Sequence, residues 1–484
     1  MAVSTYKIIT QSLHEAFSND PTTKANMTKL QPLFNRIAII GGGPAGLAAA
    51  KALAMEPVDF AAIDLFERRD HLGGLWYHKG NKSLIHPHVP STDPSAGEIA
   101  DKNAKESDLY FSAIYQFMET NIIHWLMLYR DVPFPKGTFS FPERRKVLKY
   151  VQEYVDTIPH EKVNIRENSN VTRVEKVNDI WEIDVECGGK TESCLEYDAV
   201  ILANGHFNTP FIPDVEGLSE WNENIPNSII HSKYFESPNT YRGKRVLVIG
   251  NAASGVDIST QISTVAEQVY VSVRDLDNIG FQNDLIEYID LIEKYNWQDK
   301  SVLTSSGHKY NNIDVVIFCT GYLYSMPFLY SDVIKDGSRV QDVYKQIFNV
   351  YDPSLTFVAL LKNVVPMPLS ESQSALIARY FSGRYKLPNQ EERQCSYEKD
   401  LAEKGKGSKF HTYGYPQDVE YYRHLQDLVD EQGLRTPGLV APIWDDKLAR
   451  ERLLSSELKS KRLQQLVEHV KKLRSEGKDF ELPQ

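Results

Sequence analysis

Two glycine-rich loops constrain the fold of this chain more than any other feature. The first is Gly41-Gly42-Gly43-Pro44-Ala45-Gly46 and the second is Gly250-Asn251-Ala252-Ala253-Ser254-Gly255. Each follows a short apolar run that predicts a strand, at residues 36–40 and 244–249, and leads into small residues that predict a helix. In this setting the glycines allow a tight turn, and the helix N-terminus can face a pyrophosphate. The repeated pattern predicts two dinucleotide sites.

The residues after each loop indicate which nucleotide binds where. The run at 60–66 predicts a second strand that ends at Glu67, whose carboxylate can accept hydrogen bonds from both ribose hydroxyls. The run at 268–273 ends at Arg274, whose guanidinium suits a 2′-phosphate. An acidic residue after the first loop and a basic residue after the second favour FAD at the first loop and NADP at the second. The alternative is that Glu67 and Arg274 are ordinary surface residues.

Composition excludes several classes of protein. A chain of 484 residues exceeds one ordinary domain, and its formal net charge of -11 disfavours nucleic-acid binding. The four cysteines form no CxxC pair and no metal-ligand spacing, which favours a reducing compartment and predicts no metal. No apolar run is long enough to span a membrane or to form a signal core. We therefore expect a cytoplasmic protein whose N-terminal residues are an extension, not a transit peptide.

The chain between and after the loops predicts the domain organisation. Residues 163–203 alternate apolar and polar side chains, and apolar strands run into Gly205 and Gly321, which we interpret as crossing points between domains. The predicted fold class is α/β, with two Rossmann-like dinucleotide-binding domains, the NADP domain being inserted into a split FAD domain, and a helical C-terminal extension. The predicted segments are 1–34 (N-terminal extension), 35–215 (first part of the FAD domain), 216–325 (NADP domain), 326–445 (second part of the FAD domain) and 446–484 (amphipathic helix).

The C-terminal region changes character. Residues 389–410 are polar and predict an exposed excursion, whereas 448–473 place apolar residues at helical spacing among many Lys and Arg. The apolar positions are Leu454, Leu458, Leu463, Leu466, Val467 and Val470. We favour a helix packed on its own protein. Peripheral contact with an intracellular membrane, or with a partner, is the alternative.

An ordered set of short motifs resembles the flavin-containing monooxygenases, most closely the compact fungal and bacterial members. The set comprises the first loop, Leu72-Gly73-Gly74-Leu75-Trp76, Glu119-Thr120-Asn121, Phe141-Pro142-Glu143-Arg144, the second loop and Cys319-Thr320-Gly321-Tyr322. The resemblance covers residues 35–380 approximately. It implies FAD and NADPH as cofactors, with molecular oxygen and a small nucleophile as co-substrates.

The resemblance also implies roles for individual residues. Leu75 and Trp76 would lie at the FAD, and the alternative for Trp76 is a core aromatic. Asn121 would contact both cofactors and support the oxygenated intermediate, because a carboxamide offers donors and an acceptor without charge. Its alternative is to cap a helix through 122–129. Thr120 would assist through its backbone or hydroxyl, and Gln373 would lie near the flavin.

Two departures from the family pattern stand out. Ala252 replaces a glycine of the second loop, and its methyl group would push the phosphates slightly outward, which puts the strength of NADP binding in question. The fingerprint FxGxxxHxxxF keeps His231 and Phe235 but has Ile225 and Asn227 in place of Phe and Gly. His231 is interpreted either as ordering the linker between domains or as a satisfied structural histidine.

The mechanism that the resemblance implies needs no catalytic dyad. NADPH reduces FAD, the reduced flavin and O₂ form a C4a-hydroperoxide, and a thiol, thioether or amine attacks its distal oxygen while water is excluded. A Baeyer–Villiger monooxygenase and a catalytically silent nucleotide-binding partner protein are the alternatives. A flavin disulfide reductase is disfavoured because Cys187 and Cys194 do not form the required redox dithiol.

Overall fold

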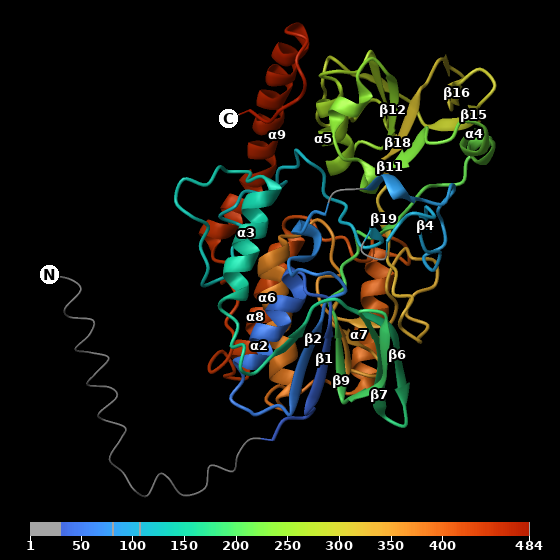
Figure 1. Ribbon diagram of the computed structural model, residues 1–484. Coiled ribbons are helices and arrows are strands. Elements are labelled where there is room, and N and C mark those ends of the chain that lie inside the picture. Colours follow the sequence, from blue (N-terminus) through green and yellow to red (C-terminus); the bar gives the residue numbers. More distant parts are fainter. Residues whose placement is uncertain (1–30, 80–81, 106–107, 484) are drawn as a thin grey trace, which may run out of the picture.

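The computed structural model describes residues 31–79, 82–105 and 108–483. The chain forms two α/β units, one below the other in Figure 1. The lower unit contains β1, β2 and β9, and the upper unit contains β11, β12 and β18. The long helix α9 (Asp446–Ser475) stands beside the upper unit. Of the predicted N-terminal extension, residues 1–30 lie outside the described part of the chain.

The first unit is built on a seven-stranded sheet with the order β20-β21-β22-β9-β1-β2-β5. The strands from β22 (Leu355–Phe357) to β5 (Asn164–Arg166) are parallel, and β1 (Arg36–Ile40) lies between β9 (Ala199–Leu202) and β2 (Ala62–Phe66). Both faces of such a sheet are covered, which is why its strands are continuous apolar runs. On β1, Ile37 and Ile39 face the helical side of the core, whereas Ala38 and Ile40 face the side of β6 and β7.

The second unit is built on five parallel strands with the order β11-β18-β12-β13-β14. At its centre β12 (Arg245–Ile249) lies between β18 (Val315–Phe318) and β13 (Gln268–Ser272). All five strands fall between β9 and β22 of the first sheet. The predicted fold class is therefore confirmed: one Rossmann-like unit is inserted into another. The residue numbers at which the domains divide stay predictions.

The chain crosses between the units along two adjacent segments. It leaves after β9 and returns after β18, and the segments β10 (Thr209–Pro210) and β19 (Tyr322–Leu323) pair antiparallel. Gly205 (φ +73°) and Gly321 (φ +88°) take left-handed backbone conformations at these points, which glycine adopts without steric cost. The two glycines predicted at the crossings therefore begin a two-stranded connection.

His231 ties one of these crossings to the second unit. Its Nδ1 accepts a hydrogen bond from the Lys233 amide (3.2 Å), so Nε2 carries the proton and donates to the Gly321 carbonyl (2.9 Å). The side chain is fully buried, and burial lowers its pKa to about 3, which keeps the ring neutral. Both interpretations of His231 hold, because a satisfied structural histidine is what orders the linker.

The remaining elements cover the two sheets. The helices are α2 (Pro44–Ala54), α3 (Arg144–Val155), α4 (Leu218–Asn224), α5 (Ala253–Ile262), α6 (Pro366–Phe381), α7 (Gln390–Lys404) and α8 (Gln417–Glu431). The remaining strands are β3 (Ile85–His86), β4 (Ile99–Ala100), β6 (Ser169–Val177), β7 (Ile180–Cys187), β8 (Lys190–Tyr197), β11 (Ile229–His231), β14 (Glu287–Ile289), β15 (Ile292–Asn296), β16 (Ser301–Thr304), β17 (Lys309–Tyr310), β20 (Val343–Tyr344) and β21 (Phe348–Asn349). The β-rich stretch predicted at 163–203 is thus confirmed.

The prediction for residues 389–410 needs a helix added, and the alternative helix at 122–129 is wrong. Residues 390–404 of the predicted exposed excursion form the largely exposed helix α7, capped by reciprocal hydrogen bonds between Asn389 and Glu392. Only Arg393 and Tyr397 of this helix are buried, so it carries almost no apolar periodicity. Residues 122–129 form turns and no helix.

The amphipathic C-terminal helix is confirmed. Of the apolar positions predicted to face the protein, Leu463, Leu466, Val467 and Val470 are buried, as expected of a helix that packs on its own chain. Leu454 is an exception, with 49% of its surface exposed. Among the described residues, no helix is both long and apolar enough to cross a membrane.

Candidate cofactor and active site

The first glycine loop joins β1 to α2 at the centre of the first sheet. Gly41 has φ +110°, and a Cβ atom there would lie 2.6 Å from the Ala203 carbonyl oxygen. A Cβ atom on Gly46 would lie 1.8 Å from the Gly41 carbonyl oxygen, so only glycine permits this approach of helix to strand. Helix α2 begins at Pro44 after Gly43, with no side-chain cap and no acidic residue in its first turn. Its amide groups are therefore available to an anion such as a pyrophosphate.

The second loop reproduces this geometry between β12 and α5. Gly250 has φ +100°, and a Cβ atom there would lie 2.9 Å from the Cys319 carbonyl oxygen. A Cβ atom on Gly255 would lie 2.0 Å from the Gly250 carbonyl oxygen. Helix α5 again begins without a side-chain cap or an acidic residue. The two loops therefore have equivalent geometry, one in each unit, and each suits an anion.

Ala252 occupies the position that Gly43 occupies in the first loop. The backbone angles agree closely, with φ −86° and ψ −166° at Ala252 and φ −84° and ψ −177° at Gly43. In the first loop a Cβ atom on Gly43 would come within 3.2 Å of the Gly74 Cα atom. Ala252 is exposed instead, so its methyl group is tolerated there.

Ala253 is also exposed, and Ser254 is half-buried in the first turn of α5. These two positions are accessible to a phosphate group, as the sequence predicts for this loop. Gly255 is buried behind them, where it serves the packing of helix on strand.

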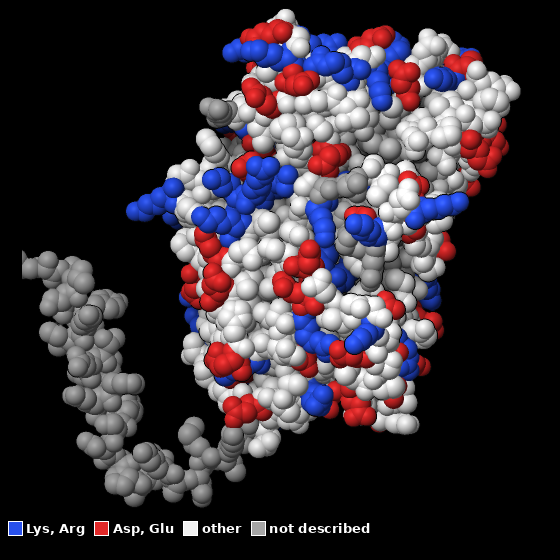
Figure 2. Space-filling model, viewed as in Figure 1, with Lys and Arg blue, Asp and Glu red and all other residues white. Residues whose placement is uncertain are grey.

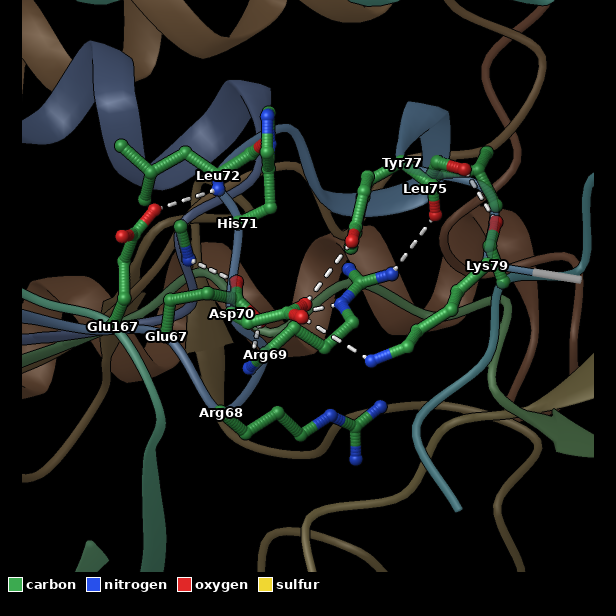
Figure 3. A network of polar contacts seen from close by, with 12 residues as sticks. Glu67, Arg68, Arg69, Asp70, His71, Leu72, Leu75, Tyr77, Lys79 and Glu167 are labelled. Atoms are coloured by element: carbon green, nitrogen blue, oxygen red, sulfur yellow. Dashed lines mark hydrogen bonds and ion pairs between the residues drawn. The ribbon is translucent and has the colours of Figure 1, made fainter. Parts of the chain in front are cut away.

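Glu67 follows β2 and is 4% exposed. One carboxylate oxygen accepts a hydrogen bond from the Gly42 amide (2.9 Å), and the other accepts from the Arg69 amide (3.0 Å) and Nε (3.3 Å). Figure 3 shows this carboxylate within a polar network in which Arg69 and Asp70 continue towards Tyr77, while Arg68 extends away. The alternative that Glu67 is a surface residue is wrong. Its contact with a ribose stays a prediction.

Arg274 follows β13 and is exposed. Its side chain makes no hydrogen bond or ion pair with another described residue. A guanidinium held at the end of the second strand of a Rossmann unit, with its donors available, suits a 2′-phosphate. That contact also stays a prediction.

Leu75 and Trp76 lie in a short 3₁₀ turn (Gly74–Trp76) that packs against the first loop. A Cβ atom on Gly74 would lie 2.6 Å from the Gly43 Cα atom, so the two segments touch through their backbones. Trp76 is 7% exposed and belongs to the core of the first unit, which matches the core-aromatic interpretation. Leu75 is half-buried and retains accessible surface.

The segment at 115–121 bridges the two units and carries Asn121. The Tyr115 hydroxyl donates to Asp257 on α5, and Gln261 Nε2 on the same helix donates to the Phe117 carbonyl (3.2 Å). Met118 packs against the cores of both units. At the end of this segment Asn121 is exposed, and it caps no helix because none follows.

The chain as a whole is similar to flavin monooxygenases. The profile of the flavin-binding monooxygenase-like family matches residues 101–279 and 291–455, and an NAD(P)-binding Rossmann-like profile matches residues 39–98. This chain belongs to the flavin-binding monooxygenase-like family. The cofactors of this monooxygenase are FAD and NADPH.

Three relatives show the extent of the similarity. The thiol-specific monooxygenase of Saccharomyces cerevisiae is 30% identical over 93% of this chain and 98% of its own length. The flavin-containing monooxygenase FMO GS-OX-like 4 of Arabidopsis thaliana is 33% identical over 74% of this chain and 78% of its own. The structure of S-allyl-L-cysteine S-oxygenase from Allium sativum matches with a TM-score of 0.73 and 25% identity, covering 91% of this chain and 98% of that one.

The residues present fit two dinucleotide cofactors. Each unit offers an uncapped helix N-terminus directly behind a loop whose glycines cannot bear side chains. The acidic Glu67 and the basic Arg274 follow the equivalent second strands, β2 and β13. This difference in charge is what FAD in one unit and NADPH in the other require.

Two side chains predicted to contact a cofactor of this monooxygenase are almost wholly buried. Thr120 is 2% exposed: its hydroxyl donates to the Ile122 carbonyl (2.8 Å) and its amide donates to the Pro142 carbonyl (3.1 Å). Gln373 is 0% exposed: its Oε1 accepts a hydrogen bond from the Ala359 amide (2.8 Å), and its Nε2 donates to the Tyr421 hydroxyl (2.9 Å). Both side chains bind neighbouring backbone groups, and their predicted contacts with a cofactor stay predictions.

Sequence reasoning missed the residues that hold the Asn121 segment. The motif at 141–144 pairs with it, since the Arg144 amide donates to the Met118 carbonyl (3.2 Å). From α9, Lys459 and Arg462 contact Thr120 and Glu119. Their spacing of three residues places both on one helix face, but nothing in the sequence identifies their partners.

Proposed function

We propose that this monooxygenase oxygenates the sulfur of small thiols and thioethers, with amines as further soft nucleophiles. The observation that carries the proposal is the match with the thiol-specific monooxygenase of Saccharomyces cerevisiae over nearly the full length of both chains. The S-allyl-L-cysteine S-oxygenase, whose structure matches this one, supports the same substrate class.

In this proposal FAD binds at the first loop and NADPH at the second. The Gly41–Gly46 loop and Glu67 hold one nucleotide, and the Gly250–Gly255 loop and Arg274 hold the other. Bound FAD supplies the redox chemistry that takes reducing equivalents from NADPH and activates oxygen. Asn121 lies on the segment between the units, where its carboxamide can contact both cofactors without supplying a proton.

We also propose that the protein works in the cytoplasm with molecular oxygen and a small nucleophile as its co-substrates. Its four cysteines are free, which favours a reducing compartment.

The decisive experiment compares substrates under one set of conditions. Oxygen-dependent oxidation of NADPH by the purified holoenzyme is measured with a small thiol, a thioether, a tertiary amine, a cyclic ketone and no addition. We expect the two sulfur compounds to accelerate NADPH oxidation most and to gain one oxygen atom, as detected by mass spectrometry. A lactone from the ketone without sulfur products would establish a Baeyer–Villiger monooxygenase instead. The absence of product from every compound would favour the silent nucleotide-binding protein.

A further inference from the structure

Helix α9 runs along both units. It comprises 30 residues, which at about 1.5 Å of rise per residue makes it roughly 45 Å long. Figure 2 shows Lys and Arg side chains gathered over α3 and over the upper end of α9, where they face solvent. Four other basic side chains of α9 face the protein instead, and they attach the helix to three different parts of the fold.

The first attachment is to the first unit. Arg452 Nε donates to Asp418 Oδ2 on α8 (2.7 Å), and its Nη2 donates to the Asn363 carbonyl (3.1 Å). The Asp418 side chain has no exposed surface, so this pair is largely desolvated. Breaking such a pair by removing one partner leaves an uncompensated charge, which makes it a firm anchor.

The second attachment is to the segment that carries Asn121. Arg462 donates to both carboxylate oxygens of Glu119, from Nε (3.0 Å) and from Nη2 (2.6 Å). Lys459 Nζ donates to the Thr120 carbonyl (3.0 Å) and lies 5.0 Å from the centre of the Phe141 ring. A two-point guanidinium–carboxylate pair fixes orientation as well as distance. The two residues that directly precede Asn121 are therefore held by α9.

The third attachment is to the second unit. Arg474 Nη1 donates to the carbonyls of Ser263 (2.7 Å) and Ala266 (2.6 Å), just beyond the C-terminus of α5. A cation at this end of a helix is favoured by the helix dipole and by the unpaired carbonyls. Beyond α9, Phe480 is 1% exposed and packs against Phe117 at 5.2 Å between ring centres.

We propose that Lys459 and Arg462 are positioning residues that set the place of Asn121 between the two units. The helix is anchored on the first unit at one end and on the second at the other, so it fixes the segment relative to both. Consecutive Cα atoms are about 3.8 Å apart, so a displacement of Glu119 and Thr120 displaces Asn121 with them. The inference rests on the proposed function, in which Asn121 contacts both cofactors.

The test uses the full-length holoenzyme and four substitutions. Arg462→Gln and Lys459→Met remove the contacts, and Arg462→Lys keeps the charge but loses the two-point geometry. Lys461→Gln is the matched control, because Lys461 lies on the same helix, is 62% exposed and pairs only with Glu457 among the described residues. FAD content and thermal unfolding verify that each variant is folded and loaded.

Two readouts are measured. The first is hydrogen peroxide released per NADPH oxidised in the presence of a thiol, which should rise about tenfold in Arg462→Gln and Lys459→Met. The peroxide release of Arg462→Lys should lie between that of these two variants and that of wild type. The peroxide release of Lys461→Gln should match that of wild type. The second is amide hydrogen exchange of residues 117–122, which should become faster in the same variants and does not depend on turnover.

The outcomes separate the inference from the proposed function. Wild-type exchange and wild-type peroxide release in Arg462→Gln and Lys459→Met would overturn the inference. Asn121→Ser is measured alongside them. If that variant keeps the product yield of wild type, the role of Asn121 fails, whatever the exchange of the α9 variants shows.

Discussion

At the scale of single residues, the proposed contact of Arg274 with the 2′-phosphate of NADPH can be tested. We expect Arg274→Gln to raise the KM for NADPH by about ten- to a hundredfold, because a bidentate contact with the 2′-phosphate is lost. The KM for NADH, which lacks that phosphate, should not change. Steady-state kinetics with both cofactors test this. Lys309→Gln removes an exposed charge from the same unit and serves as the control; an equal change for NADH and NADPH would contradict the assignment.

Glu371 makes stability depend on pH. It is 1% exposed, and burial raises the pKa of its carboxyl to about 7, although the Arg130 amide and the Tyr154 hydroxyl donate to it. The folded protein therefore keeps this proton where the unfolded chain, with an ordinary Glu pKa, has lost it. The contribution of this carboxyl to the free energy of unfolding falls by up to about 3 kcal/mol as pH rises from the pKa of Glu in the unfolded chain to about 7. Above about pH 7 the contribution is constant.

Glu371→Gln removes this titration. We expect the free energy of unfolding of the variant, relative to wild type, to increase between about pH 5 and about pH 8. Urea unfolding at several pH values measures the difference. A difference that stays constant across this range would show that the Glu371 carboxyl does not titrate there.

The sequence predicted the places of single residues well where a repeated motif fixes their position in the fold. Glu67 and Arg274 follow strands of a repeated pattern, so their places could be counted from the glycine loops. Thr120 and Gln373 could not be judged in this way, because their burial depends on distant segments such as Pro142 and Tyr421. Polar residue type alone does not distinguish a side chain that binds a cofactor from one that satisfies the backbone.

At the scale of elements, the two equivalent loops allow the cofactor assignment to be tested. In Gly46→Ala the new methyl group would meet the Gly41 carbonyl at 1.8 Å, and in Gly255→Ala it would meet the Gly250 carbonyl at 2.0 Å. We expect Gly46→Ala to purify without FAD. Gly255→Ala should keep FAD, visible in its absorption spectrum, but lose reduction by NADPH.

Gly97→Ala is the control for both variants, because a Cβ atom there has no neighbour within 4 Å. It should bind FAD and be reduced as wild type. Loss of FAD from Gly255→Ala together with its retention in Gly46→Ala would reverse the assignment of the two sites.

Strands were easier to predict than helices. The apolar runs of β1 and β12 are buried on both faces and stand out in any sequence. Helix α7 lacks such a signal, since most of its surface meets water. The turns at 122–129 were mistaken for a helix because their backbone is satisfied from elsewhere: the Tyr129 amide donates to the Tyr150 hydroxyl (2.7 Å).

At the scale of the whole molecule, the order of motifs was enough to predict that one unit is inserted into the other. It was not enough to predict how the units are held together. Arg462 and Glu119 are 343 residues apart, and their contact depends on the packing of α9 across both units. Lys82 makes a similar link, since its buried ammonium donates to the carbonyls of Ile114, Lys233 and Phe235.

The pairing of β10 with β19 brings the two ends of the inserted unit side by side, at Thr209 and Leu323. A segment whose ends meet can be replaced by another unit that presents the same two neighbouring ends and keeps the surface that contacts residues 115–118, Lys82 and α9. The first sheet stays continuous across the exchange, since β9 pairs with β22 and not with any strand of the insert. Cofactor preference can therefore evolve, or be engineered, within the inserted unit while the first sheet keeps its strand pairing.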